Sequence, residues 1–305
     1  MRKIIVIVGP TGAGKTAAAV ELTRKLNGEL ISADSRQVYK YLDIGTNKEG
    51  EWNGAAGLRY TGGIAQHLTD LIEPSGSFNA GEFARLALDS IKKIINSKKI
   101  PVIVGGTGLY IRALIDGLAE MPEQDAALRE ELKNLGTEEL YKQLKAFDPE
   151  SAEKNRGNPQ RLIRAIEVYK LSGTPITTLQ KNTKPLSMEY EFAQFGLTLE
   201  RTKLYDSINT RSEKMIESGM IDETKKVLAM GFPDTCSGLQ GLGYRHVVSF
   251  LRNHISREEL LENLRQDTRN YAKRQLTWFN KDKRIEWIPA SSPESIANRI
   301  ADMVE

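Results

Sequence analysis

One short stretch near the start of the chain restricts the fold more than any other. Residues 3–9, KIIVIVG, are mostly β-branched, residues 9–16 read GPTGAGKT, and residues 15–26, KTAAAVELTRKL, have helical composition and period. A strand that is apolar throughout is typical of a parallel sheet, where both faces are buried. GPTGAGKT fits the pattern G-x-x-x-x-G-K-[ST] at every fixed position, between a strand and a helix, as this pattern requires. The start of the chain therefore predicts an α/β protein with a phosphate-binding loop.

The first hundred residues continue the alternation of strands and helices. GELISAD (28–34) and KKIPVIVGG (98–106) have strand composition, and the second follows the amphipathic helix AGEFARLALDSIKKIINS (80–97). This alternation predicts an α/β fold with a P-loop NTPase-like parallel sheet flanked by helices. We expect the strand that ends before Asp34 to lie beside the first strand.

The composition changes after residue 117. From about Pro122 to Pro185 the patterns are helical, with no convincing strand. Strand composition returns in YEFAQFGLTLE (190–200), followed by long helices around KLYDSINTRSEKMIESG and REELLENLRQDTRNYAKRQLTWFN and a closing strand, RIEWIP. We therefore predict a core made of residues 1–117 and 190–305, interrupted by an all-helical insertion at 118–189.

Bulk composition narrows the class of protein. With 305 residues, 40% of them hydrophobic, and a net charge of +3, the chain predicts a globular protein that permits a polyanionic partner without requiring one. A single cysteine, Cys236, excludes an intramolecular disulfide and favours a reducing compartment. Gly9 and Pro10 end the first apolar run too early for a signal peptide, and no stretch has the length of a membrane span. We expect a cytoplasmic enzyme.

The phosphate loop, residues 9–16, has a defined use for each residue type. Gly12 and Gly14 allow backbone N–H groups to turn toward phosphate oxygens, and the helix that follows adds the positive end of its dipole. Lys15 neutralises a terminal phosphate, and the Thr16 hydroxyl is a ligand for Mg²⁺. The predicted diphosphate or nucleotide contacts are Gly9, Pro10, Thr11, Gly12, Ala13, Gly14, Lys15 and Thr16.

The loop alone does not identify its ligand. NTPases usually add a strand that ends in a metal-binding Asp, but the strand in PVIVGGTGLY ends in Gly105 and Gly106. The nearest carboxylate at a strand end is Asp34, at the edge of the sheet where α/β proteins bind ligands. From the residues alone, Asp34 is a metal ligand, a general base or a helix N-cap.

Seven segments resemble, in order and spacing, the signatures of the bacterial tRNA dimethylallyltransferase family. They are GPTGAGKT, ISADSRQVYKYLDIGT, FNAGEFAR, VIVGGTGLYIRAL, NPQRLIRAIEV, LGYR and YAKRQLTWF, and the similarity extends from Ile4 to about Ile288. Two features depart from the family pattern. The segment 45–67 is several residues longer than the common version, and Gln66 stands where a second histidine is often found.

The resemblance implies a prenyl diphosphate ligand. Members of the family transfer the dimethylallyl group from dimethylallyl diphosphate to N6 of the adenine adjacent to the anticodon, on its 3′ side, with help from Mg²⁺. The resemblance assigns Asp34 as the general base, because the adenine amine must lose a proton as the C–N bond forms. It assigns Lys15, Thr16 with Mg²⁺, and Arg211 to the leaving diphosphate, and Thr107 to positioning the base or the amine.

The resemblance also implies contacts with the anticodon stem-loop of tRNA, made in part by the helical insertion at 118–189. Separately, we expect the protein to be a monomer. The positions that correspond to RNA contacts are Asp34, Ser35, Arg36, Gln37, Thr107, Arg129, Gln160, Arg161, Leu162, Ile163, Arg164, Gln240, Gly243, Tyr244 and Arg245. Arg161 and Arg164 fall on one helical face. The target base of such an enzyme has to be extruded from its stack to reach a pocket.

Several residues allow a second interpretation. Without the resemblance, Arg211 reads as a solvated arginine and Thr107 as a helix cap. Arg265, Arg269 and Lys273 form a basic stripe that either follows a phosphate backbone or is a solvated helix face. On the same segment we expect core-facing side chains at Leu261, Leu264, Tyr271 and Phe279.

Three other functions compete with tRNA prenylation. They are a phosphate-loop kinase, an adenylate isopentenyltransferase that uses a free nucleotide, and a non-catalytic GTPase-like RNA-binding module. The absence of a strand-end Asp after residues 101–104 disfavours the kinase, and no guanine-specificity pattern supports the third. The helical insertion and the basic C-terminal helix favour tRNA over a free nucleotide.

Overall fold

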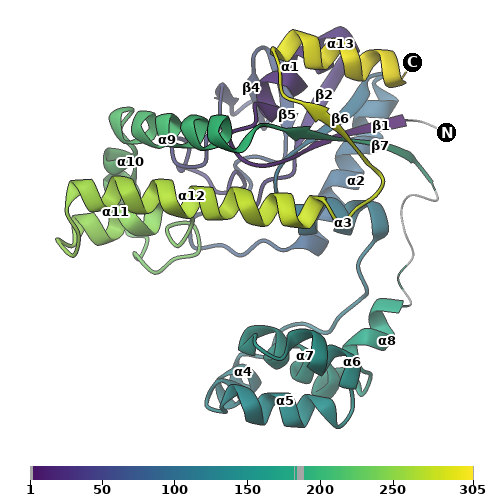
Figure 1. Ribbon diagram of the computed structural model, residues 1–305, viewed down its shortest axis with the longest axis vertical. Coiled ribbons are helices and arrows are strands. Elements are labelled where there is room, and N and C mark those ends of the chain that lie inside the picture. Colours follow the sequence, from purple (N-terminus) through teal and green to yellow (C-terminus); the bar gives the residue numbers. More distant parts are fainter. Residues whose placement is uncertain (1–2, 182, 184–188, 305) are drawn as a thin grey trace. The chain divides into compact units, whose positions relative to one another are not determined.

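The computed structural model describes residues 3–181, 183 and 189–304 (Figure 1). The chain divides into two units: a core unit, Met1–Ile115 with Ser187–Glu305, and a helical unit, Asp116–Leu186. These limits lie near residues 118 and 189, the limits expected from sequence. The end of the expected insertion, residues 182 and 184–188, falls outside the described residues.

The core unit is built on an eight-stranded sheet in the order β3-β4-β5-β2-β6-β1-β7-β8. Its strands are β1 (Lys3–Val8), β2 (Gly28–Ser32), β3 (Glu51–Asn53), β4 (Leu58–Thr61), β5 (Ile64–His67), β6 (Ile100–Val104), β7 (Glu191–Thr198) and β8 (Ile285–Pro289). The strands from β5 to β8 in this order are parallel, as the apolar run Ile4–Val8 predicts. An α/β fold with a P-loop-like parallel sheet is confirmed.

The expectation that β2 lies beside β1 is wrong. β6 lies between them and pairs with both, with Val102 opposite Ile5 of β1 and opposite Leu30 of β2. The connection from β1 to β2 leaves room for one strand between them, and β6 occupies this place in the sheet. Because all three strands are parallel, their carboxyl ends still meet at one edge of the sheet. The turn after β6 therefore lies between the phosphate loop and Asp34.

The long segment 45–67 forms an antiparallel extension of the sheet that the sequence analysis missed. β3 pairs with β4, and β4 turns into β5 through Gly62 and Gly63, with φ angles of 56° and 80°. Two successive residues with positive φ make the tight hairpin turn whose twist suits a strand pair. The signal was present in the pairs Asn53-Gly54 and Gly62-Gly63 between residues of strand composition.

Helices cover both faces of the sheet (Figure 1). The helices of the core unit are α1 (Lys15–Lys25), α2 (Ala80–Asn96), α3 (Gly108–Asp116), α9 (Arg201–Glu217), α10 (Met220–Ala229), α11 (Tyr244–Leu251), α12 (Arg257–Phe279) and α13 (Pro293–Val304). α13, which sequence analysis did not predict, packs alongside α1 and buries Ile296 and Ile300 in the same hydrophobic cluster as Ile5 and Ile7 of β1. Among the described residues, no helix combines the length and apolar composition needed to cross a bilayer.

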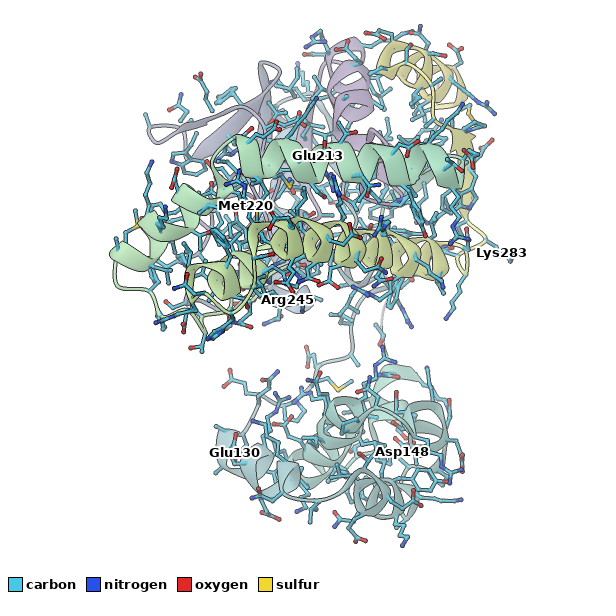
Figure 2. All side chains as sticks on the ribbon, turned by 60° about the vertical axis from the view of Figure 1, so that its left-hand side comes forward. Glu130, Asp148, Glu213, Met220, Arg245 and Lys283 are labelled. Atoms are coloured by element: carbon cyan, nitrogen blue, oxygen red, sulfur yellow. The ribbon has the colours of Figure 1, made fainter. Side chains whose placement is uncertain are left out.

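The basic stripe on α12 connects this helix to α9, which runs alongside it (Figure 2). Arg265 forms an ion pair with Glu213 of α9, and Arg269 pairs with Glu262 at 2.6 Å. Lys273 is exposed. Two members of the stripe are therefore matched by carboxylates of the protein, which agrees better with a helix contact than with a bare phosphate-binding surface.

The helical unit has a hydrophobic core of its own. Its helices are α4 (Ala126–Lys133), α5 (Thr137–Lys145), α6 (Pro149–Asn155), α7 (Pro159–Ser172) and α8 (Ile176–Lys181). Leu132, Leu140, Leu144 and Leu162 are fully buried together. Asp148, labelled in Figure 2, caps α6 through the Ser151 N–H and also accepts a hydrogen bond of 2.9 Å from the Thr177 hydroxyl of α8.

Phe83 provides a test of the core unit. Its side chain is fully buried on α2 and stacks on Tyr110 of α3, with 4.6 Å between ring centroids. Phe83→Ala should lower the free energy of unfolding by about 3–5 kcal/mol, because it removes an aromatic ring and leaves a cavity. Urea unfolding followed through a signal of the core unit measures this change. Met303→Ala, at an exposed position of α13, is the control, and an equal loss there would contradict the packing described.

Candidate active site

The phosphate loop connects the end of β1 to the start of α1. Gly9, Gly12 and Gly14 have φ angles of 137°, 88° and 80°, in the region that side chains rarely adopt. A Cβ atom on Gly9 would also lie 2.6 Å from the backbone oxygen of Leu197 in β7. The loop therefore requires glycine at these positions, and its shape directs N–H groups toward the edge of the sheet.

A cavity of about 280 Å³ opens above this loop. Its wall contains the loop residues Thr11, Gly12, Gly14, Lys15 and Thr16, together with Ser32, Asp34, Gln37, Thr46, Asn47, Glu49, Gln66, Ser207, Arg211, Tyr271 and Gln275, among others. The wall thus brings together three of the four residues predicted for catalysis: Lys15, Asp34 and Arg211. Thr107 lies next to Gly106, which is on the wall.

A second cavity of about 310 Å³ adjoins the first. The two share Thr11, Asp34, Thr46, Asn47, Arg211 and Tyr271, and the second is further lined by Ser35, Arg36, Gly45, Met215, Gln240, Gly241, Leu242, Tyr244, Arg245 and Arg274. Asp34 and Arg211 therefore lie where the cavity of the phosphate loop meets a second cavity whose wall combines aromatic, apolar and arginine side chains. Such an arrangement accommodates two ligands that meet at a carboxylate.

Asp34 is held by a turn and does not cap a helix. One carboxylate oxygen accepts a hydrogen bond of 2.8 Å from the Arg36 N–H, and residues 35–38 form a turn. The interpretation of Asp34 as a helix N-cap is therefore wrong. The side chain is half-buried on the wall of both cavities, where it is able to accept a proton from a ligand.

Lys15 and Arg211 place two cations beside this carboxylate. The Lys15 ammonium donates to the Pro10 carbonyl at 2.7 Å, and the Arg211 guanidinium donates to the Thr11 hydroxyl. Burial, followed by repulsion from Arg211, lowers the pKa of Lys15 to about 7, and the charge of Asp34 opposes this shift. Burial also lowers the pKa of Arg211. Arg211 is half-buried at the cavity, so its interpretation as an ordinary solvated arginine is wrong.

Thr107 connects the turn after β6 to the turn after β2. Its hydroxyl accepts a hydrogen bond of 3.0 Å from the Ser35 N–H, and its own N–H donates to the Ala33 carbonyl at 3.2 Å. The side chain therefore binds the residue next to Asp34. This contact supports the predicted positioning role over that of a cap for α3.

Two residues of α12 belong to the site although the sequence analysis did not assign them to it. Tyr271, expected to face the core, lines both cavities. Burial and the nearby charge of Asp34 raise the pKa of Tyr271 to about 12, so its hydroxyl stays protonated at neutral pH. Gln275 contacts the phosphate loop. Their spacing of four residues in YAKRQLTWF is the signal that would have placed both on one helical face.

The predicted RNA contacts of the core unit divide into two groups. Arg36, Gln240 and Arg245 line the second cavity, and Gln240 and Arg245 are exposed. The side chain of Gln37 instead lines the first cavity, and its amide oxygen accepts a hydrogen bond of 2.8 Å from the Ser32 hydroxyl.

Tyr244 and Gly243, also predicted to contact RNA, are buried. The Tyr244 side chain is only 1% exposed, and its hydroxyl accepts a hydrogen bond of 2.9 Å from the Gly45 N–H and donates to Glu223. Gly243 is buried, with a φ of 90°. Tyr244 is part of the wall of the second cavity, although only a small part of its side chain is accessible.

In the helical unit, the predicted RNA contacts again separate by burial. Gln160 and Arg161 are exposed at the start of α7. Leu162 and Ile163 are 0% and 8% exposed and pack in the core of this unit, so direct RNA contact by their side chains is wrong. An α-helix that packs on one side must bury some members of any run of four residues.

Arg129 and Arg164 converge on one buried carboxylate. Arg129 binds both oxygens of Glu167, at 2.9 and 3.0 Å, and Arg164 binds one of them at 2.6 Å. Glu167 is fully buried, and its hydrogen bonds to both arginines hold its pKa below its ordinary value against the effect of burial. Two cations share one anion, which leaves this cluster with excess positive charge at the surface of α7.

A family model described as IPP transferase matches residues 37–282. The chain belongs to the IPP transferase family. The tRNA dimethylallyltransferase of Endomicrobium trichonymphae is 50% identical over 285 residues, covering 93% of this chain and 94% of the relative. That of Acetivibrio thermocellus is 42% identical over 294 residues, covering 94% and 92%. The resemblance drawn from seven sequence segments is thus confirmed.

Solved structures of IPP transferases have the same fold. A tRNA delta(2)-isopentenylpyrophosphate transferase from Staphylococcus epidermidis matches with a TM-score of 0.70 at 33% identity, covering 100% of this chain and 99% of that one. A eukaryotic dimethylallyltransferase acting on tRNA matches with a TM-score of 0.79 at 25% identity, covering 100% of this chain and 78% of that one.

The predicted Mg²⁺ ligand of this IPP transferase family member is Thr16, on the wall of the first cavity. Among the described residues, no group of three or more His, Cys, Asp or Glu side chains is arranged to hold a metal ion. Mg²⁺ commonly binds through one or two protein oxygens, substrate phosphates and water. The hydroxyl of Thr16 beside an anion-binding loop fits such a partly substrate-held ion.

Lys15→Met should stabilise the free protein at neutral pH. The pKa of Lys15 is about 7 in the folded protein and is expected near its ordinary value of 10.5 in the unfolded chain. Between these values the unfolded chain binds more protons, so the stability of the unsubstituted protein rises with pH by up to about 1.4 kcal/mol per unit. The advantage of the variant should therefore be constant below pH 7 and shrink toward pH 10. Thermal unfolding across this range measures it.

Lys25→Met is the matched control, because Lys25 lies in solvent near the other end of α1. It removes the same charge from the same helix without touching the cavity. If both variants changed stability with the same dependence on pH, the environment assigned to Lys15 would be wrong.

Proposed function

We propose that this protein transfers the dimethylallyl group of dimethylallyl diphosphate to N6 of the adenine adjacent to the anticodon, on its 3′ side, in tRNA. The observation that carries this proposal is the position of Asp34 on the wall shared by the phosphate-loop cavity and the second cavity. A phosphate loop whose neighbouring cavity ends at a carboxylate suits an alkyl transfer better than a phosphoryl transfer. The names of the relatives support the same assignment.

The first cavity would hold the diphosphate. Backbone N–H groups of the phosphate loop and the start of α1 favour negative charge, and Lys15 and Arg211 add two cations. An anionic ligand next to Lys15 raises its pKa, so the ammonium would be charged whenever the diphosphate is bound. These groups would stabilise the charge that grows on the diphosphate as it leaves. When bound, Mg²⁺ at Thr16 would supply further charge neutralisation to the leaving group.

The second cavity would hold the extruded adenine, with N6 directed to Asp34. As the bond between N6 and the allylic carbon forms, the bond from that carbon to the diphosphate oxygen breaks and its electron pair leaves with the diphosphate. The proton lost by N6 passes to the carboxylate of Asp34. Thr107, through Ser35, would keep this carboxylate in place, and Tyr271 would form part of the wall between the two ligands.

The helical unit would contribute to binding the anticodon stem-loop. Arg161 and Gln160 are exposed, and the cluster of Arg129 and Arg164 on Glu167 carries excess positive charge. RNA loops are recognised through phosphate contacts, which arginine makes, and through hydrogen bonds to splayed bases, which arginine and glutamine both make. We further propose that the enzyme acts as a monomer, because residues of one chain line both cavities. We propose that it acts in the cytoplasm, because its single cysteine suits a reducing compartment.

The protein should label tRNA when it is incubated with Mg²⁺, radiolabelled dimethylallyl diphosphate and an unmodified tRNA that has an adenine directly on the 3′ side of its anticodon. Asp34→Asn should reduce the single-turnover rate by about 10²–10⁴-fold, because an amide is not able to accept the proton. The amide oxygen still accepts the hydrogen bond from Arg36, so tRNA affinity should be retained. Asp302→Asn, at an exposed position of α13, is the matched control.

Three outcomes would contradict the proposal. Label on AMP with none on tRNA would indicate an adenylate isopentenyltransferase. Transfer of the terminal phosphate of ATP to an acceptor, with no prenyl transfer, would indicate a kinase. Loss of tRNA binding in Asp34→Asn with an unchanged rate per bound complex would show that Asp34 binds RNA and is not the base.

The role of the helical unit has a separate test in the salt dependence of tRNA binding. Arg161→Met should lower the slope of log affinity against log salt by about 0.7–1, because one fewer counterion is displaced. Lys142→Met, at an exposed position of α5, is the control for loss of a cation from the same unit. Equal slopes for the Arg161 variant and the unsubstituted protein, measured by filter binding, would exclude a phosphate contact at Arg161.

A further inference from the structure

One face of α12 packs against the glycine-rich turn that follows β6. Tyr271, Gln275 and Trp278 have spacings of four and three residues and so share this face. A Cβ atom on Gly106 would lie 2.0 Å from the Gln275 amide nitrogen, and one on Gly108 would lie 2.2 Å from the Trp278 ring. The helix and the turn are therefore in direct contact, with no room for a side chain between them.

Both ends of the Gln275 amide are used at this contact. Its oxygen accepts a hydrogen bond of 2.8 Å from the Thr11 N–H in the phosphate loop. Its nitrogen donates to the Gly106 carbonyl at 2.9 Å. Gln275 is only 5% exposed, so a side chain lacking either group would leave a buried backbone group without its partner.

The turn that receives Gln275 also holds the residues on either side of Asp34. A Cβ atom on Gly105 would lie 2.1 Å from the Ala33 carbonyl oxygen, and the Thr107 N–H donates to that oxygen at 3.2 Å. The Thr107 hydroxyl accepts from the Ser35 N–H at 3.0 Å. Ala33 and Ser35 are thus both fixed to this turn.

We propose that Gln275 is a positioning residue that sets the phosphate loop at a fixed place relative to Asp34. The contacts run from Thr11 through Gln275 to Gly106, and from Thr107 to the residues beside Asp34. This inference rests on the proposed function, in which the allylic carbon lies between a diphosphate on the loop and an amine next to Asp34. In such a displacement, a shift of about 1 Å between the two partners lowers the rate by about 10²-fold.

Loss of the Gln275 hydrogen bonds to Thr11 and Gly106 should lower the reaction rate and weaken diphosphate binding without weakening tRNA binding. Gln275→Met keeps the length of the side chain and removes both hydrogen bonds. It should reduce the single-turnover rate by about 10–100-fold. It should also weaken the binding of inorganic diphosphate several-fold, because the Thr11 N–H is released, and change the tRNA dissociation constant less than about twofold. Gln266→Met, an exposed glutamine on the same helix, is the matched control.

Gln275→Glu distinguishes hydrogen bonding from packing. An ionised carboxylate still accepts from Thr11 but is not able to donate to Gly106, whereas the protonated acid does both. The rate of this variant, divided by the rate of the unsubstituted enzyme at the same pH, should therefore rise as the pH falls. The corresponding ratio for Gln275→Met should stay level. Thermal unfolding confirms that each variant is folded at the assay temperature.

Several results would overturn the inference. They are an unchanged rate in Gln275→Met, a loss confined to tRNA affinity, or a rate ratio for Gln275→Glu that does not rise at lower pH. If the unsubstituted protein failed to prenylate tRNA, the proposed function would be wrong. Calorimetric titration with inorganic diphosphate would still test whether Gln275 positions the phosphate loop. Equal diphosphate affinity in Gln275→Met and the unsubstituted protein would then contradict it.

Discussion

The pairing of β6 with both β1 and β2 is the constraint on which the rest of the site depends. It places three strand ends side by side in the order that brings the phosphate loop, the glycine turn and the Asp34 turn together. Each of these three segments is a turn that is fixed by the strand before it and by hydrogen bonds to its neighbouring turn. Their geometry is inherited from the sheet, and small residues at Gly105 and Gly106 allow the turns to approach.

Sequence reasoning was most successful where a local pattern fixes the backbone. The phosphate loop and the long helices followed from glycine positions and period. It placed β2 wrongly, because which strand fills a gap in a parallel sheet depends on pairing energies between distant segments. It missed the antiparallel strands between residues 51 and 67, although Asn53-Gly54 and Gly62-Gly63 marked their turns. These short strands carry too few residues for a clear alternation.

The site residues show the same limit. Asp34 and Lys15 were found from local motifs, whereas Arg211 and Thr107 needed the family resemblance. Tyr271 and Gln275 were not found, since a glutamine in a helix carries no sign of what it meets across the fold. Likewise, Leu162 and Tyr244 were assigned to RNA from their place in a motif, but their side chains are buried. A motif marks a region, and only packing divides it into residues that hold the region and residues that face a ligand.

The helical unit occupies a single connection, between α3 and β7, and has a separate hydrophobic core. Neither α3 nor β7 requires anything from the unit to complete the pairing of β7 with β1. Evolution is therefore free to lengthen, recharge or replace this unit while the strand register and the phosphate loop stay as they are. Under the proposed function, substrate range and chemistry can diverge at different rates within one polypeptide, because the parts that carry them have independent cores.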